Sequence, residues 1–191
     1  MIFDKYDIIV VGGGHAGCEA AAAAANMGNK TLLITMNMNA MAAMSCNPAV
    51  GGIAKGQIVR EIDALGGQMG IIADKTMIQF RMLNKSKGPA VWSPRVQSDK
   101  FEFAAEWRNV LEKTKNLEFW QDHVDSLIVE GDIIRGVHCQ MGGDIYSKTV
   151  ILTNGTFLNG KIFIGEKSFS GGRISESSSG KATYRWKLGL G

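Results

Sequence analysis

The apolar positions near the start of the chain form two short runs with an alanine-rich stretch between them. Ile8 to Val11 are continuously apolar, and a second run, KTLLIT, covers 30–35. Continuous apolar runs are typical of parallel strands that are buried on both faces. The alanine-rich stretch favours a helix, and Gly28 suits the end of that helix. The pattern predicts a strand, a helix and a second strand, which together form a βαβ unit.

Two further helices are predicted in the middle of the chain. Over 57–67 the apolar residues recur at helical spacing and form one stripe, Ile58, Ile62 and Leu65. Over 100–115 a second helix has an expected apolar face of Phe101, Ala104, Ala105, Val110 and Leu111. Residues 77–99 lie between these helices and are expected to be irregular and basic.

The second half of the chain contains three β-type segments, VDSLIVE, IIRGVHCQM and DIYSKTVILT, with the turn signals GD and GGD between them. They predict a β-meander followed by a return strand. From Asn154 onward the composition changes to glycine and serine, without a long helical stripe. We therefore expect one domain over 1–155 and the start of a second, inserted and truncated domain over 156–191.

The amino-acid composition excludes few classes of protein. The 191 residues carry a formal net charge of +3 and include 45% hydrophobic residues, an ordinary globular mixture. The three cysteines are far apart, form no CxxC pair and show no metal-ligand spacing with the histidines, which fits a reducing cytoplasm. The run from Ile8 to Val11 is far too short to cross a membrane. The 24 glycines gather in clusters, which suggests that the backbone approaches a ligand closely.

The first glycine cluster has the spacing G-x-G-x-x-G, directly between the first predicted strand and its helix. Gly12 allows a tight turn, Gly14 lets the backbone approach a pyrophosphate, and Gly17 lets the helix pack on the strand. The pyrophosphate would bind at the N-terminus of the helix. A dinucleotide-binding loop is therefore expected, although the second strand ends in TMN, without the acid that usually binds the ribose.

The β-meander favours FAD over NAD as the dinucleotide. A Rossmann dehydrogenase has no need of a meander, whereas the TNG at 153–155 that follows it resembles the second flavin-side motif of two-dinucleotide-domain flavoproteins. We therefore expect an α/β fold with a Rossmann-like FAD-binding domain of the glutathione-reductase type.

The stretch MSCNPAVGGIAKGQ, over 44–57, should run close to a flavin bound in this loop. A helix N-terminus or Lys55 near Cys46 would favour its thiolate form and make it a usable nucleophile. The alternative for Cys46 is a buried, inert thiol, which is the common fate of a free cysteine. Cys18 and Cys139 lie in a predicted helix and strand, and we expect them to be packing residues.

Several longer motifs carry a resemblance to a known family. IIVVGGGHAGCEAAAAAANMG, SCNPAVGGIAKG, EIDALGG, IQFRMLNKSKGPAVWSPRVQSDK, LTNGTFLNGKIFIG and SGGR occur in this order over essentially the whole chain. Together they resemble the MnmG (GidA) family, whose members are FAD-dependent enzymes that modify the wobble uridine of certain tRNAs. Family members are much longer, so the chain resembles an N-terminal portion of one.

The resemblance implies cofactors, partners and site residues. The cofactors are FAD and NADH, with methylene-tetrahydrofolate as carbon donor, and the partners are tRNA, the MnmE GTPase and a second copy in a homodimer. Cys46 matches a catalytic cysteine of the family, whereas a second such cysteine and the NADH site lie beyond residue 191. The implied FAD contacts are Gly12, Gly13, Gly14, His15, Ala16, Gly17, Val124 and Ser179.

The family's reaction gives Cys46 a chemical role. The family adds an aminomethyl or carboxymethylaminomethyl group to C5 of the uridine. That carbon becomes nucleophilic when a thiolate adds to C6, because the resulting enolate can attack an iminium-like carbon. Cys46 would be this nucleophile or a proton shuttle beside the flavin.

A basic segment lies between Gln79 and Lys100. It contains Arg81, Lys85, Lys87 and Arg95, with Trp92 among them. Cations with an interleaved aromatic residue suit single-stranded RNA, because phosphates contact the cations and a base stacks on the ring. A solvated loop, or cations that face the FAD pyrophosphate, are the alternatives, and the resemblance favours contact with tRNA.

Two other functions remain open. A flavin-dependent disulfide reductase would need a redox-active cysteine pair, and Cys46 has no nearby partner in the sequence. A non-catalytic FAD-binding fragment is the second, since half of the family's machinery lies outside these residues.

Overall fold

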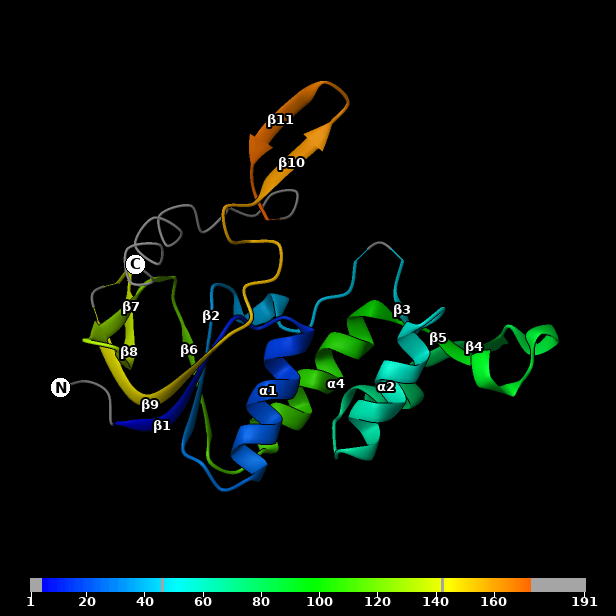
Figure 1. Cartoon of the computed structure of the whole chain (residues 1–191), viewed down its shortest axis with the longest axis horizontal. Helices are drawn as coiled ribbons and strands as arrows, with labels where there is room; N and C mark the ends of the chain where they lie inside the picture. The colour runs from blue at the N-terminus through cyan, green and yellow to red at the C-terminus, as the bar shows by residue number, and fades with distance from the viewer. Residues whose placement is uncertain (1–4, 46, 142, 173–191) are drawn as a thin grey trace.

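The computed structural model describes residues 5–45, 47–141 and 143–172. Its centre is a six-stranded sheet with the order β6-β2-β1-β9-β8-β7, from which a three-stranded sheet and a hairpin extend (Figure 1). The strands of the central sheet are β1 (Tyr6–Val11), β2 (Thr31–Thr35), β6 (Leu117–Gln121), β7 (Val124–Glu130), β8 (Ile133–Cys139) and β9 (Asp144–Leu152).

The predicted βαβ unit is confirmed. β1 and β2 pair in parallel, and α1 (His15–Asn26) connects them. β9 pairs in parallel with β1 on the other side, and β6 pairs in parallel with β2. The sequence reasoning did not anticipate β6, which places a further strand end at the same edge of the sheet.

The two faces of β1 are buried against different elements. Val10 packs with α1 and with α4 (Lys100–Lys113), whereas Ile9 and Val11 pack against β7, β8 and β9. The predicted meander is confirmed, because β7, β8 and the first part of β9 are antiparallel neighbours. β9 then continues along β1 as the predicted return strand. Burial on both faces explains the continuous apolar runs Ile8–Val11 of β1 and Leu32–Ile34 of β2.

The helix predicted over 100–115 is confirmed, and its predicted apolar face is confirmed only in part. Leu111 is buried and Val110 packs against the core, whereas Phe101 is 76% exposed. Phe103 and Trp107, which were not predicted, are fully buried with Leu111. The three buried residues are four positions apart, which places them on one side of the helix, and their large side chains bury more surface than alanines. Asp99 begins the helix by accepting hydrogen bonds from two N–H groups of its first turn.

The helix predicted over 57–67 exists as α2 (Lys55–Ala64), and α3 (Met69–Lys75) follows it. Its apolar stripe is not its buried face, because Ile58 is 53% exposed and Leu65 is 90% exposed. Instead, Val59 packs against the core, and Gly56 is buried so close to β5 that a Cβ would be 2.6 Å from the carbonyl oxygen of Pro94.

The expectation that 77–99 is irregular was wrong. β4 (Met77–Leu83) and β5 (Ser93–Ser98) form an antiparallel ribbon, and β3 (Ala49–Gly51) pairs with β5. Two short 3₁₀ turns, η2 (Lys85–Lys87) and η3 (Pro89–Val91), form its tip. We name the β4–β5 ribbon with its tip the basic arm; it extends away from the central sheet in Figure 1. Most of β4 is exposed on both faces. Its sequence does alternate apolar and polar residues over Ile78–Met82, a strand signal that the sequence reasoning did not use.

After β9 the chain forms a hairpin of β10 (Lys161–Ile164) and β11 (Lys167–Ser170), which projects beyond the carboxyl end of the sheet (Figure 1). The domain boundary at 155 stays a prediction. No helix within the described ranges is long and apolar enough to span a membrane.

Candidate dinucleotide site

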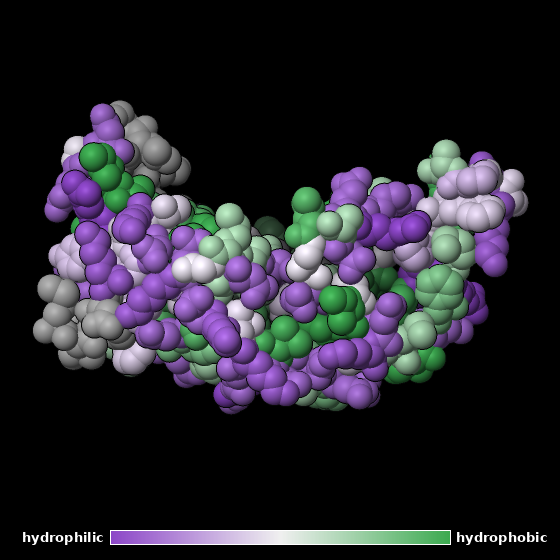
Figure 2. Space-filling view, turned by 90° about the horizontal axis from the view of Figure 1, so that it is seen from below, coloured by the Kyte–Doolittle hydropathy of each residue, from purple (hydrophilic) through white to green (hydrophobic). Residues whose placement is uncertain are grey.

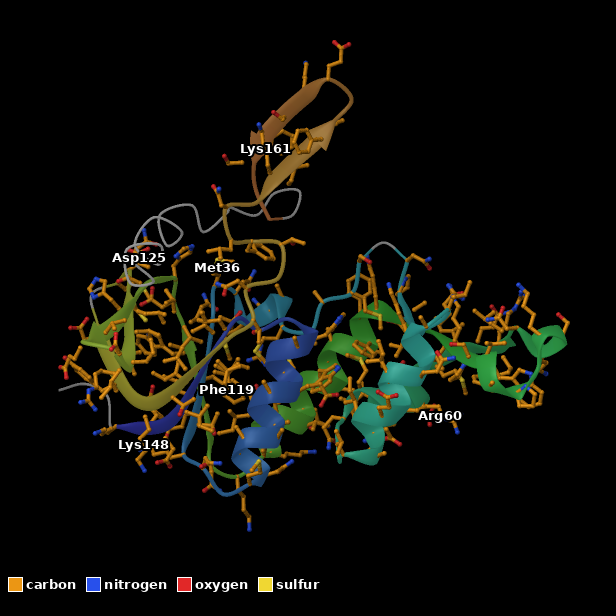
Figure 3. The ribbon with its side chains drawn as sticks, in the orientation of Figure 1. Met36, Arg60, Phe119, Asp125, Lys148 and Lys161 are labelled. Carbon is orange, nitrogen blue, oxygen red and sulfur yellow. The ribbon has the colours of Figure 1, made fainter. Side chains whose placement is uncertain are left out.

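The carboxyl ends of β1, β2, β6 and β9 surround a cavity of about 280 Å³. It is lined by the glycine loop after β1, by residues after β2, by Asp122 and Val124, and by 153–157 after β9. Figure 3 shows Met36 at this end of the sheet and Lys148 at the opposite end. Ligands of open α/β sheets bind at the carboxyl ends of the strands, so the cavity is in the expected place.

The three motif glycines occupy three different environments. Gly12 has φ +108°, and a Cβ there would lie 2.6 Å from the carbonyl oxygen of Thr153. A Cβ on Gly17 would overlap the carbonyl oxygen of Gly12, because α1 packs tightly on the turn. Gly14 lines the cavity, and a Cβ there would meet no described atom within 4 Å. The open side of Gly14 leaves room for a ligand against the backbone.

The N-terminus of α1 faces this cavity. Gly14 is its N-cap and supplies no side chain, and the first helical hydrogen bond runs from Cys18 N–H to the Gly14 carbonyl. The first-turn N–H groups of any helix lack partners within the helix, and the dipole adds partial positive charge. The first turn of α1 also contains no acidic residue. These features together suit an anionic group such as a pyrophosphate.

Thr153 fastens the loop after β9 to the glycine loop. Its N–H donates to the Val11 carbonyl at 2.9 Å. Its hydroxyl lies 2.8 Å from that oxygen and 3.0 Å from the Gly12 carbonyl oxygen. The TNG motif therefore holds the two loops that line the cavity in one arrangement.

No acidic residue directly follows β2, but Asp122 lines the cavity near the end of that strand. Asn37 lines the cavity, but its side-chain oxygen accepts from Asn39 N–H and begins η1 (Met38–Ala40). Asp122, after β6, also lines the cavity and is only 7% exposed. Its carboxylate accepts from the N–H groups of His123 and Met141 and from the Trp120 indole. Sequence reasoning missed Asp122 because it missed β6; the signal was an acid directly after LEFWQ.

The structure brings together only part of the predicted FAD contacts. Gly12, Gly13, Gly14, His15 and Val124 line the cavity. Ala16 and Gly17 lie in the first turn of α1, outside the cavity lining. Cys46 and Ser179 lie outside the described residues.

The predicted RNA-binding residues lie on the basic arm, apart from the cavity. Arg81 of β4 and Arg95 of β5 are directly opposite each other in the antiparallel ribbon. Lys85 and Lys87 lie in the turn at the tip. The Trp92 indole donates to the Lys85 carbonyl at 3.2 Å, and its side chain stays 41% exposed. None of these four cations is among the described residues that line the cavity, which disfavours the view that they face the pyrophosphate.

The two described cysteines are packing residues. Cys18 packs on the helical face of the sheet and Cys139 on the meander face. Burial raises the pKa of each thiol to about 12. Because the sheet separates them, they cannot form the redox pair that a flavin-dependent disulfide reductase would need.

Known proteins share this fold and much of this sequence. The family model described as "Glucose inhibited division protein A" matches residues 7–190. The "tRNA uridine 5-carboxymethylaminomethyl modification enzyme MnmG" of Flavobacterium johnsoniae is 66% identical over 178 residues, which cover 93% of this chain and 29% of that protein. The MnmG of Christiangramia forsetii is 64% identical, over 92% of this chain and 28% of its own length.

Comparison with solved structures gives the same family and the fold. GidA of Aquifex aeolicus has a TM-score of 0.94 at 48% identity, over 98% of this chain and 31% of its own. A probable FAD-dependent monooxygenase of Pseudomonas aeruginosa, PqsL, has a TM-score of 0.55 at 12% identity, over 80% of this chain and 43% of its own, which shows the fold alone. The fold is therefore an α/β FAD-binding Rossmann-like fold. The chain spans less than a third of the length of the curated relatives that it matches. It belongs to the glucose-inhibited division protein A family, the MnmG (GidA) family.

Proposed function

We propose that the chain binds FAD in the cavity at the carboxyl edge of its sheet, as the N-terminal part of a cytoplasmic flavoenzyme that modifies the wobble uridine of tRNA. The observation that carries the proposal is the open side of Gly14 at the N-terminus of α1, in a family whose named members are tRNA uridine modification enzymes.

The described residues fit FAD. Gly12 to His15 would hold the pyrophosphate, because the first turn of α1 offers N–H groups and carries no acid. Val124 and Asp122 line the same cavity beyond β6 and would contact the nucleoside. When bound, FAD would supply hydride transfer. The protein's own contribution here is to bind and orient the cofactor.

The other components of the reaction are proposed from the family. They are NADH, methylene-tetrahydrofolate as carbon donor, the MnmE GTPase and a homodimer. Cys46 is proposed as the thiolate that adds to uridine C6 and leaves again after the new bond at C5 forms and the C5 proton is lost. The NADH site belongs to the part of the relatives that this chain does not match.

The basic arm is proposed to contact tRNA. Arg81 and Arg95 are directly opposite, and like charges at such positions destabilise a sheet. Neither arginine forms an ion pair with a described residue, and Arg95 only donates to the side chain of Asn47, at 3.3 Å. A phosphate would relieve this repulsion. In Figure 2, hydrophilic and hydrophobic surface alternate along the right-hand end of the molecule, where the arm lies, and exposed Trp92 could stack on a base.

Titration of FAD into the purified chain tests the cofactor proposal. The fluorescence of FAD should fall to a saturable limit, and ADP should compete because it shares the pyrophosphate and adenosine groups. Protein that stays colourless in excess FAD would reject the proposed function.

Measurement of tRNA binding tests the proposal that the basic arm contacts tRNA. A Lys85→Glu, Lys87→Glu double variant should bind tRNA more weakly and with a flatter dependence on salt. The control is Lys113→Glu with Lys115→Glu, since these lysines line a separate hollow at the C-terminal end of α4. An unchanged salt slope in the Lys85 and Lys87 variant would argue for a solvated loop.

A further inference from the structure

His15 connects the glycine loop to the segment that follows β2. Its Nε2 lies 3.0 Å from the carbonyl oxygen of Ala42. A carbonyl oxygen can only accept, so Nε2 carries the hydrogen and donates. The N–H of Ala42 donates to the Gly13 carbonyl at 2.8 Å. Both backbone polar groups of Ala42 are therefore bonded to the dinucleotide loop, an arrangement that we name the Ala42 clamp.

The backbone of Ala42 has a conformation that needs such support. Its φ is +51°, in the left-handed region that residues other than glycine rarely adopt, and its side chain is fully buried. Conformations of this kind persist only where their surroundings hold them. Gly13 supports it through its carbonyl, and only glycine fits there, because a Cβ would lie 2.7 Å from Thr35 Oγ1 and 3.1 Å from Met41 Cγ.

The His15 ring is itself held in place. Its ring centre lies 5.8 Å from that of Phe103, with the two planes at 87°. Phe103 belongs to the buried face of α4, so the ring has a fixed neighbour on the core side. On the other side, His15 lines the cavity together with Asn37, Ala40 and Ala43. The His15 side chain thus packs against the core, lines the cavity and bonds to Ala42.

We infer that His15 is a positioning residue that couples occupancy of the dinucleotide cavity to the conformation of residues 37–45. A dinucleotide that orders the glycine loop also orders this segment, because the Ala42 clamp joins them. The segment immediately precedes Cys46, the proposed nucleophile, in the sequence. The coupling rests on the proposed FAD site, whereas the Ala42 clamp belongs to the protein alone.

Two measurements without FAD test the Ala42 clamp. Long-range ¹H–¹⁵N NMR of the wild-type histidines should show a hydrogen on Nε2 of His15, and a tautomer with hydrogen on Nδ1 alone would overturn the inference. Amide exchange of Ala42 should accelerate about tenfold in His15→Leu, as expected for the loss of one partly buried hydrogen bond that holds its backbone. His15→Asn should show the same acceleration as His15→Leu, because the asparagine side chain is too short for its amide to reach the Ala42 carbonyl.

The matched controls separate the hydrogen bond from general damage. His15→Gln places an amide donor near the position of Nε2 and should keep the slow exchange. His138→Leu removes an exposed histidine that pairs with Asp144 on the meander, and it should also leave Ala42 unchanged. Equal exchange of Ala42 in His15→Leu and wild type would overturn the clamp. Should the Leu and Asn variants not fold, the wild-type tautomer decides.

Addition of FAD tests the coupling. In the wild-type chain, FAD should slow exchange over residues 38–45, and in His15→Leu it should slow this segment much less at equal saturation. FAD that binds without changing this segment in wild type overturns the coupling and leaves the proposed function standing. Absence of FAD binding overturns the proposed function and the coupling together, while the FAD-free comparison still decides the clamp.

Discussion

Gly17 packs so closely on Gly12 that a Cβ at position 17 would overlap the Gly12 carbonyl oxygen, and it would lie 2.7 Å from Thr153 Oγ1. The first helix, the turn after β1 and the loop after β9 thus meet at one point. A side chain there cannot be accommodated by rotation of a flexible neighbour, because the obstructing atom is backbone.

Gly17→Ala should therefore destabilise the fold strongly. We expect a loss of about 3 kcal/mol or more in the free energy of unfolding, since overpacking against backbone forces the helix away from the sheet. Urea unfolding followed by circular dichroism measures this change. Unaltered stability would mean that α1 can shift without cost.

Gly14→Ala should leave the stability of the fold unchanged but weaken FAD binding. Its φ of −74° suits alanine, and the added Cβ meets no described atom, so the unfolding midpoint should stay close to that of wild type. The methyl group would extend into the cavity and weaken FAD binding at least tenfold. Fluorescence titration measures the affinity, and wild-type affinity in this variant would place the ligand elsewhere.

Thr153→Val should loosen the two loops. The change keeps the side-chain shape but removes the hydroxyl that bonds to the carbonyl oxygens of Val11 or Gly12. We expect a loss of about 1 kcal/mol in the free energy of unfolding, the usual net value of an intramolecular hydrogen bond. Thr153→Ser keeps the hydroxyl and serves as the control. A loss in Thr153→Ser without a loss in Thr153→Val would contradict this and assign the effect to the methyl group.

Arg81→Gln should weaken tRNA binding without lowering the stability of the fold. Removing one of two opposed cations should leave stability unchanged or raise it by up to about 0.5 kcal/mol. The same change should weaken tRNA binding and lower the salt slope by about 1. Arg108→Gln on α4 is the control, because Arg108 already pairs with Glu112 at 2.7 Å. Wild-type tRNA binding by the Arg81 variant would remove the arm from the interface.

Alkaline pH should destabilise the fold through its buried thiols. The pKa of Cys18 and that of Cys139 are raised by burial from 9.0 to about 12, so between these values the unfolded chain loses thiol protons that the folded chain keeps. Stability then falls as pH rises, by up to about 1.4 kcal/mol per pH unit for each thiol. Cys18→Ala should reduce this slope relative to wild type, and an identical slope would contradict the buried-thiol explanation. Denaturant unfolding between about pH 9 and 11 provides the comparison.

Local patterns in the sequence determined the parallel strands, the dinucleotide loop, the meander and the family. Each depends on residues close together in the chain: a continuous apolar run for β1, or the spacing of Gly12, Gly14 and Gly17. Periodicity reports burial within one element, and a motif reports the backbone geometry of one turn.

Tertiary structure alone decided which surfaces meet. The burial of Phe103 and not Phe101, the pairing of exposed β4 with β5, and the position of Asp122 beside the end of β2 depend on partners distant in the sequence. The Ala42 clamp is of the same kind, because a left-handed alanine is stable only where His15 and Gly13 hold it. Local preference cannot encode such contacts, since their energy arises only when separate segments come together.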